Sequence, residues 1–366
     1  MDPTWKDAVD GVLGRASPAV DGPWEALRLV SGAGGSANPL LAPDDVEMSA
    51  PLGPGEGART VALPIVLCDG SHGQLSPQAR LAMLQAAART GAVLRMADPG
   101  PDLVELAAEL GVPLWVVLGP RRTATTVEAA RTAAVVELQL ADVSGAGSIA
   151  RSVDALDGRG SLAGAVAAMR ALAPGAQVWV GLWPGASQEA LRAAATSGAS
   201  GVLAHGRTRA SPLRRWTTGP DTPAALSAAR RAVGRAKPPE GSVAPLLAVA
   251  GGFKDGLEVA KALALGARLV AMAAAPRIAL GCELCGGCGP GQCAPAPADG
   301  WRGQADRLTA YLARVRAQAA SALAQAGCAR AADASTAMLE ATTYDAAAAT
   351  GVALSGYGEP LPMWLH

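Results

Sequence analysis

Short apolar runs that alternate with alanine-rich helical stretches constrain this sequence more than any other feature. Eight runs have the length and composition of buried strands: residues 61–68, 92–97, 114–118, 135–141, 177–182, 201–204, 245–250 and 268–273. Strands that alternate with helices form a parallel sheet, and a count of eight favours an α/β fold of the closed (β/α)8 type, the TIM barrel. An open doubly wound sheet is the alternative, because a strand count from one sequence is easily off by one.

Start and stop signals mark the helical stretches. The clearest belong to the first helix, where Ser76 is a candidate N-cap, Pro77 fits the first helical position and Gly91 follows as a stop. Further helices are expected at 102–110, 123–133, 161–172, 187–197, 256–265 and 301–327. The sequence therefore predicts four parts: an irregular arm packed on the barrel (1–60), the barrel itself (61–281), a cysteine loop (282–295) and a helical C-terminal extension (296–366).

Composition narrows the class of function. The 366 residues carry 31 basic and 31 acidic side chains, so the basic excess that phosphate-backbone binding needs is missing, and we expect no nucleic acid partner. The first 20 residues lack the apolar stretch of a signal peptide, and the most apolar segment, 262–276, is broken by Gly266 and Arg268, so we expect no membrane span. The expectation is a cytoplasmic protein, in which clustered cysteines indicate metal binding or catalysis rather than disulfides.

Four cysteines lie close together just after the eighth predicted strand. Their spacing is C-x2-C-x2-C-x4-C, and the glycines between them let the backbone wrap the sulfurs around one centre. Compact runs of this kind hold iron–sulfur clusters, whereas four-cysteine zinc sites usually consist of two separated pairs. Zinc, and cysteines that bind no metal, stay open as alternatives. The candidate ligands are Cys282, Cys285, Cys288 and Cys293.

A second segment with candidate chemistry is the turn after the seventh strand, where Gly251 and Gly252 precede a helix. TIM barrels commonly bind phosphate groups at the loops after strands seven and eight, through backbone N–H groups at the start of a helix. Adjacent glycines let a phosphate approach the backbone closely. A plain tight turn between strand and helix is the alternative.

These two segments together resemble a known family. Residues 248–285, AVAGGFKDGLEVAKALALGARLVAMAAAPRIALGCELC, look like the end of the FMN-binding domain of the glutamate synthase family. Cys282, Cys288 and Cys293 match that family's C-x5-C-x4-C cluster pattern, and Cys285 is an additional position.

The resemblance extends upstream. Residues 63–91 are similar to the family's first strand, flavin-contacting loop and first helix, and residues 207–214 stand where the family has a loop after strand six. The resemblance implies an FMN-binding TIM barrel with a 3Fe-4S or 4Fe-4S cluster. It also implies an oxidoreductase acting on the CH–NH2 or imine group of an amino acid, for example in converting 2-oxoglutarate to glutamate.

Several positions depart from the family pattern. Arg95 replaces an asparagine after the second strand, and Asp98 replaces a glutamate there. Gln139 stands where the family has a lysine, a charge that can stabilise a reduced flavin. Ala273 and Ala274 replace a Gly-Thr pair expected near the flavin phosphate. This sequence therefore matches the family pattern less closely at the flavin and substrate sites than at the cysteines.

The partners that we expect for this protein come from a comparison with the additional parts of a complete glutamate synthase. Its N-terminal cysteine nucleophile is missing, since Asp2 follows Met1, and no G-x-G-x-x-G fingerprint opens a second domain. We therefore expect a small-molecule substrate, with ammonia and electrons supplied by separate proteins. A homo-oligomer stays open.

The resemblance assigns individual residues to roles at the mouth of the barrel. Asp98 and Gln139 are the expected catalytic residues. By their own chemistry, Arg207 and Arg209 are expected to bind a carboxylate- or phosphate-bearing substrate, and a solvated surface run of charges is the alternative. His205, at the end of the sixth strand, also faces the mouth. The expected cofactor-binding residues are Ser71, His72, Gly73, Arg95, Gly251, Gly252, Ala273 and Ala274.

Three functions stay open on this evidence. The first is an FMN and iron–sulfur oxidoreductase of the glutamate synthase type. The second is the same scaffold acting on another small substrate, which the altered mouth residues motivate. The third is an iron–sulfur subunit that has lost its flavin, which Arg95 and Ala273–Ala274 motivate.

Overall fold

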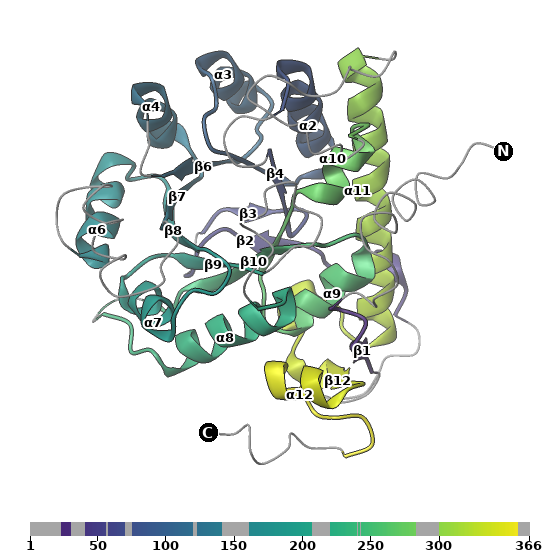
Figure 1. Cartoon of the computed structure of the whole chain (residues 1–366). Helices are drawn as coiled ribbons and strands as arrows, with labels where there is room; N and C mark the ends of the chain where they lie inside the picture. The colour runs from purple at the N-terminus through teal and green to yellow at the C-terminus, as the bar shows by residue number, and fades with distance from the viewer. Residues whose placement is uncertain are drawn as a thin grey trace.

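Eight parallel strands close into a barrel at the centre of the protein (Figure 1). The computed structural model describes residues 23–30, 41–55, 58–69, 75–119, 123–140, 161–206, 220–239, 241, 243–282 and 300–357. The barrel strands are β4 (Ile65–Cys68), β5 (Val93–Met96), β6 (Leu114–Leu118), β7 (Val135–Gln139), β8 (Gln177–Leu182), β9 (Gly201–His205), β10 (Leu246–Gly251) and β11 (Leu269–Met272). They pair in chain order, and β11 pairs with β4 to close the ring, so the predicted TIM barrel is confirmed.

Helices surround this ring. They are α2 (Pro77–Thr90), α3 (Pro101–Glu109), α4 (Ala124–Thr132), α6 (Leu162–Leu172), α7 (Gln188–Thr196), α8 (Thr222–Arg235), α9 (Gly256–Ala264) and α10 (Ala274–Ala279). The long helix α11 (Gly300–Gln325), predicted at 301–327, runs along one side of the barrel and packs on α2 and α9 (Figure 1). Helices α8 and α10 were not among the predicted elements.

The first helix begins and ends where its sequence signals predict. The Ser76 hydroxyl accepts a hydrogen bond from the backbone N–H of Ala79 at 3.2 Å, and Pro77 occupies the first turn. Gly91 closes the helix in the left-handed conformation, with φ of 71°. Glycine adopts that conformation without the steric cost that a Cβ carries.

The first predicted strand, 61–68, is divided in the structure, and this boundary was wrong. Residues Thr60–Val61 form β3, which pairs antiparallel with β2 (Ala50–Pro51), and the barrel strand β4 begins only at Ile65. The β2–β3 hairpin closes the N-terminal end of the barrel, where the Leu52 carbonyl accepts a hydrogen bond from the indole N–H of Trp179 at 2.8 Å. Part of the predicted N-terminal arm therefore belongs to the barrel core.

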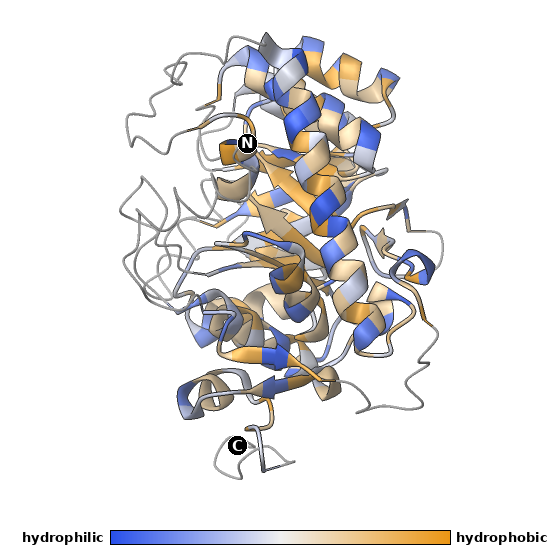
Figure 2. Ribbon diagram, turned by 90° about the vertical axis from the view of Figure 1, so that its right-hand side faces the viewer, coloured by the Kyte–Doolittle hydropathy of each residue, from blue (hydrophilic) through white to orange (hydrophobic). Residues whose placement is uncertain are grey.

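Two apolar clusters build the core. One lies between the strands and the helices, and the other fills the barrel, where the rings of Trp115 and Trp179 pack 4.8 Å apart. The interior cluster includes Val66, Cys68, Val93, Trp115, Val117, Val135, Trp179, Leu203, Ala248, Ala250, Leu269 and Ala271. Figure 2 shows largely hydrophobic strands at the centre, surrounded by helices that contain both hydrophilic and hydrophobic residues.

Segments near the two ends of the described chain lie side by side. Strand β1 (Leu27–Leu29) pairs antiparallel with β12 (Leu339–Ala341), and α12 (Tyr344–Thr350) packs on α8. Trp24 stacks near Phe253, and its carbonyl accepts a hydrogen bond from the Lys261 ammonium at 2.8 Å. In the part of the chain that the structure describes, no helix is long and apolar enough to cross a membrane.

A pair of glycine substitutions tests the packing inside the barrel. A Cβ on residue 201 would lie 2.4 Å from the Trp179 ring, so we expect Gly201→Ala to lower the free energy of unfolding by about 1–3 kcal/mol. Gly234, exposed in α8 with open space around it, is the control: we expect Gly234→Ala to raise stability by roughly 0.5–1 kcal/mol. Chemical denaturation measures both. Equal effects would contradict the packing described here.

Candidate active site at the barrel mouth

The C-terminal ends of the barrel strands form a mouth, and small residues occupy the positions just beyond β5, β10 and β11, a set that we call the small-residue arc. Ala97 follows β5 and Ala273 follows β11, and both pack on the interior cluster. Gly252 follows β10 and is exposed. Since alternate residues of a strand face the same side, these positions continue the inward-facing rows of their strands. None of these three residues carries a side chain larger than a methyl group.

Larger and more polar side chains stand on the other arc. Gln139 ends β7, and Trp183 and His205 follow from β8 and β9 with ring centroids 6.4 Å apart and an angle of 24° between the rings. His205 is buried, and burial together with the nearby Arg95 charge lowers its pKa to about 3. The imidazole is therefore neutral near pH 7 and presents one N–H donor and one nitrogen acceptor.

A buried ion pair lies inside the barrel beneath this mouth. The Arg95 guanidinium donates to both carboxylate oxygens of Glu137, with distances of 2.6 and 2.7 Å, and the Trp115 indole N–H donates to the same carboxylate at 2.7 Å. Residue 181 is glycine, and a Cβ there would lie 2.2 Å from Glu137 Oε1. Burial opposes the charge of Glu137, but Arg95 and Trp115 together hold its pKa below the ordinary value.

A second buried carboxylate follows β4. Asp69 is 1% exposed and accepts a hydrogen bond from Arg80 at 3.0 Å, while its carbonyl accepts one from Arg277 at 2.7 Å. Arg80 also donates to the carbonyl of Asp98. Burial is the main reason that the pKa of Asp69 rises to about 6, although the nearby arginines oppose the rise. This cluster ties the loop after β4 to α2, to the loop after β5 and to α10.

The predicted catalytic residues occupy different surroundings. Asp98 is exposed at the rim, and its carboxylate accepts hydrogen bonds from the hydroxyls of Thr126 at 2.7 Å and Thr123 at 3.2 Å, at the start of α4. Gln139 is half-buried at the end of β7, two residues beyond Glu137. Their catalytic roles, like the cofactor-binding role of Arg95, stay predictions.

The two glycines after β10 differ in their surroundings. A Cβ on Gly251 would lie 2.1 Å from the Thr222 hydroxyl, so this glycine lets α8 pack against the strand. A Cβ on Gly252 would meet no atom within 4 Å, so the backbone there is open. Ala273 gives α10 no side-chain cap. Open backbone beside an uncapped helix start and a small-residue arc fits a flat flavin ring with a phosphate tail.

The structure describes only one of the candidate metal ligands. Cys282 follows α10, and its backbone N–H donates to the carbonyl of Arg277 at 2.9 Å. This hydrogen bond fixes the backbone of Cys282 against the end of α10. Within the described residues there is no group of three or more His, Cys, Asp or Glu that could hold a metal ion. The predicted site residues outside the described part are Ser71, His72, Gly73, Arg207, Arg209, Cys285, Cys288 and Cys293.

Sequence reasoning missed Glu137, Trp115 and Asp69. The signal for the first was present, since Glu137 and Arg95 are lone charges of opposite sign within two runs otherwise rich in apolar residues. Such charges face the barrel interior only if they are paired.

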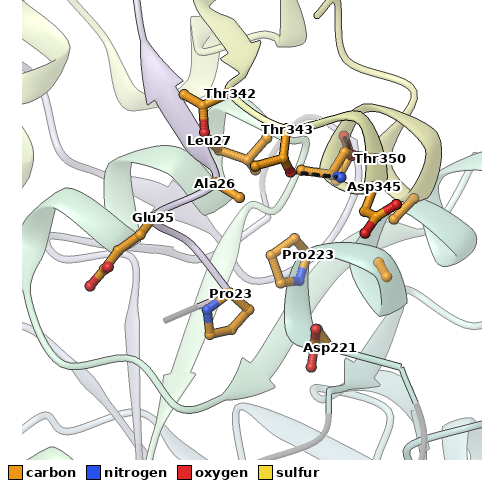
Figure 3. Close-up of a pocket in the computed structure, with 13 residues that line it drawn as sticks. Pro23, Glu25, Ala26, Leu27, Asp221, Pro223, Thr342, Thr343, Asp345 and Thr350 are labelled. Carbon is orange, nitrogen blue, oxygen red and sulfur yellow. Dashed lines mark hydrogen bonds between the residues drawn. The ribbon is translucent and has the colours of Figure 1, made fainter. Parts of the chain in front are cut away.

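A separate pocket of about 360 Å³ lies outside the barrel axis (Figure 3). Its walls come from residues 23–27, the start of α8 and the segment 342–350. Figure 3 shows Pro23 and Pro223 facing Thr343 and Asp345 across it. None of the predicted site residues lines this pocket.

Comparison with known proteins identifies the family. Residues 139–328, just over half of the chain, match the model of the conserved region in glutamate synthase. The chain belongs to the glutamate synthase family. The matched region begins at the end of β7 and includes β8 to β11, the cysteine segment and α11. No curated protein matches the chain.

Solved structures of mandelate oxidase share the fold. A variant with a monooxide FMN adduct is 18% identical with a TM-score of 0.57, over 92% of this chain and 98% of that one. A variant with benzaldehyde is 16% identical with a TM-score of 0.58, over 92% and 96% of the two chains. At such identities the likeness establishes the barrel fold. The family match, taken with this barrel, supports a flavin-dependent oxidoreductase with FMN as its cofactor.

The buried Asp69 carboxylate predicts a pH dependence of stability. Because its pKa rises from 3.8 to about 6 on folding, its charge costs stability above pH 6, and protonation relieves that cost as the pH falls through 6 toward 4. We expect the stability of the wild type relative to Asp69→Asn to increase on going from pH 7 to pH 4, by on the order of 2–3 kcal/mol. Denaturant unfolding at several pH values measures it. A difference independent of pH would contradict the burial-driven pKa.

Proposed function

We propose that this protein is an FMN- and iron–sulfur-dependent oxidoreductase of the glutamate synthase type, acting on the CH–NH2 or imine group of an amino acid. The observation that carries the proposal is the mouth itself. A small-residue arc and the open backbone at Gly252 lie beside a helix that leads directly to Cys282. The family match over residues 139–328 supports the same chemistry.

FMN, when bound, supplies the hydride and single-electron chemistry that protein side chains lack. The residues that would hold it are Gly252, whose open backbone can approach a phosphate, and Ala273 and Ala274 at the start of α10. Ala97 and Ala273 would leave room for the ring, and the packed barrel interior beneath them would exclude water from its underside.

The polar arc would bind and orient the substrate. Gln139 offers both an amide donor and a carbonyl acceptor at the end of β7, and neutral His205 can donate or accept a hydrogen bond that orients an amine or imine nitrogen at the mouth. Arg207 and Arg209 follow β9 in the sequence and would pair with a substrate carboxylate. Asp98 accepts a hydrogen bond from the Thr126 hydroxyl of α4 and would thereby hold the rim of the mouth in place.

The four cysteines would hold the iron–sulfur cluster, which would supply the electron-transfer chemistry between a separate donor protein and the mouth. Arg277 supports this arrangement, since its backbone carbonyl binds the N–H of Cys282 and its side chain binds the carbonyl of Asp69. It thus connects the start of the cysteine loop with the end of β4, from which the flavin-contacting loop departs. Ammonia would come from a further partner.

One observation favours a second candidate, the same scaffold acting on a different small substrate. The Asp98 carboxylate binds Thr123 and Thr126 rather than a side chain of the mouth, so it is poorly placed to assist chemistry there. An enzyme that acts on a different substrate would need its catalytic carboxylate in a different position from that of the family. FMN and the cluster would be retained in this case.

Cofactor content and turnover test the proposal. We expect protein purified without oxygen to contain about one FMN per chain together with iron and acid-labile sulfide. With a reductant, 2-oxoglutarate and ammonia should give glutamate. Protein that contains both cofactors but shows neither this turnover nor a spectral response to 2-oxoglutarate would favour the second candidate.

A cysteine variant completes that test. We expect Cys288→Ser to lose iron, because a serine hydroxyl replaces one thiolate ligand. Cys68→Ser is the control, since Cys68 is buried inside the barrel core and its thiol pKa is raised to about 11 by burial. Colourless protein with zinc in place of iron, or full iron content in Cys288→Ser, would rule out the assignment.

If the flavin phosphate lies at Gly252, substitution of this glycine should weaken FMN binding without lowering stability. Because Gly252 borders open space, we expect Gly252→Val to keep the thermal stability of the apoprotein and to weaken FMN binding by about tenfold or more, by blocking approach to the backbone. Gly175→Val, also in open space but before β8 at the opposite end of the barrel, should bind FMN normally. Titration of apoprotein followed by flavin fluorescence measures both. Equal affinities would place the phosphate elsewhere.

A further inference from the structure

Two opposite charges buried inside a barrel need an explanation. Removing a carboxylate and a guanidinium from water costs several kcal/mol per ion, and an apolar pair of similar volume often gives equal or greater stability. Here Glu137 is fully buried and Arg95 is 7% exposed. Three hydrogen bonds, two from Arg95 and one from Trp115, hold the carboxylate. The arrangement satisfies the carboxylate but does not by itself explain why the pair is kept.

The position of Arg95 gives the reason. It pairs with Cys68, the last residue of β4, and stands one residue before the end of β5, so it belongs to the top of the barrel interior. The N-terminal end is closed by the β2–β3 hairpin and by Trp179. The remaining exposure of Arg95 therefore lies toward the mouth, whereas Glu137 has none.

Two carboxylates, Glu137 and Asp69, interact with the Arg95 charge, and Arg95 is the most exposed of the three groups. Cys68 and His205 are buried and neutral near pH 7, because burial raises the pKa of the thiol to about 11 and lowers that of the imidazole to about 3. Asp69 is bound by Arg80 and lies beyond the end of β4.

We propose that Arg95, held in one orientation by Glu137 and Trp115, is the fixed cation on the floor of the mouth and stabilises negative charge that develops on the pyrimidine end of a flavin. This inference rests on the proposed function. Glu137 and Trp115 are positioning residues, and Glu137 also lowers the positive potential that Arg95 creates at the mouth. A preorganised charge in a water-excluded site acts strongly, because no solvent must reorganise during the reaction.

The two members of the pair should therefore have opposite effects on the ligand. Removing Arg95 removes the favourable charge, whereas neutralising Glu137 leaves a stronger one. If the ion pair served stability alone, both substitutions would lower the free energy of unfolding. They would not change the properties of the bound flavin in opposite directions.

Sulfite provides a readout that is independent of enzyme turnover. Its sulfur lone pair forms a bond to the flavin N5, and the electron pair displaced into the ring leaves a negative charge at the pyrimidine end, so no added oxidant or reductant is needed. The FMN-bound wild type is compared with Arg95→Met, Glu137→Gln and the double variant, and the dissociation constant for sulfite follows from the loss of visible flavin absorption.

We expect Glu137→Gln to bind sulfite more tightly than the wild type. The double variant should bind sulfite more weakly than the wild type, and Arg95→Met should bind it no more tightly than the double variant. We expect the step from wild type to Arg95→Met to be about tenfold or more, and Arg95→Lys to recover part of it. If Glu137→Gln does not fold, the double variant still decides the matter, because removing both charges leaves no buried ion unpaired.

Two results would overturn the inference in distinguishable ways. FMN bound normally, with affinities for sulfite that are unchanged or shift in the same direction in both single variants, would refute the role of the pair and leave the proposed function intact. A wild-type protein that binds no FMN would refute the proposed function, and this inference with it.

Discussion

The bidentate ion pair of Arg95 and Glu137 inside a closed barrel is the interaction around which the candidate site is organised. Strand alternation directs both side chains inward, and Gly181 leaves the space that the carboxylate occupies. Ring closure and the β2–β3 hairpin keep water from the pair at the N-terminal end. Its only outlet in the described residues is the mouth. The fold therefore concentrates one oriented charge where barrels of this type carry out chemistry.

Contacts made by the surrounding helices α8 and α10 also determine the shape of the mouth. Packing of α8 against Gly251 fixes the end of β10, so that the next residue, Gly252, presents an open backbone. Arg277 joins α10 and the start of the cysteine segment to the end of β4. These contacts hold the ends of β4 and β10 and the start of α10 in fixed positions around the mouth.

Local signals made much of the fold predictable. Ser76, Pro77 and Gly91 specify the ends of α2 without any tertiary contact, and the apolar runs gave all eight barrel strands. The pairing of β1 with β12 joins segments more than 300 residues apart and has no local signal. Helix α8 was missed, although Asp221 and Pro223 are helix-start signals that mark its first turn. Glu137 was missed because a charge within an apolar run acquires meaning only with its partner across the barrel.

The central claim is that the mouth holds a flavin over a fixed cation. The most direct measurement is a crystal structure of protein purified with its cofactors under anaerobic conditions. The account predicts electron density for FMN at the mouth, with the pyrimidine end of the ring above Arg95 and the phosphate at the backbone of Gly252. Density for the ring elsewhere, or a ring turned so that its benzene end lies above Arg95, would contradict it.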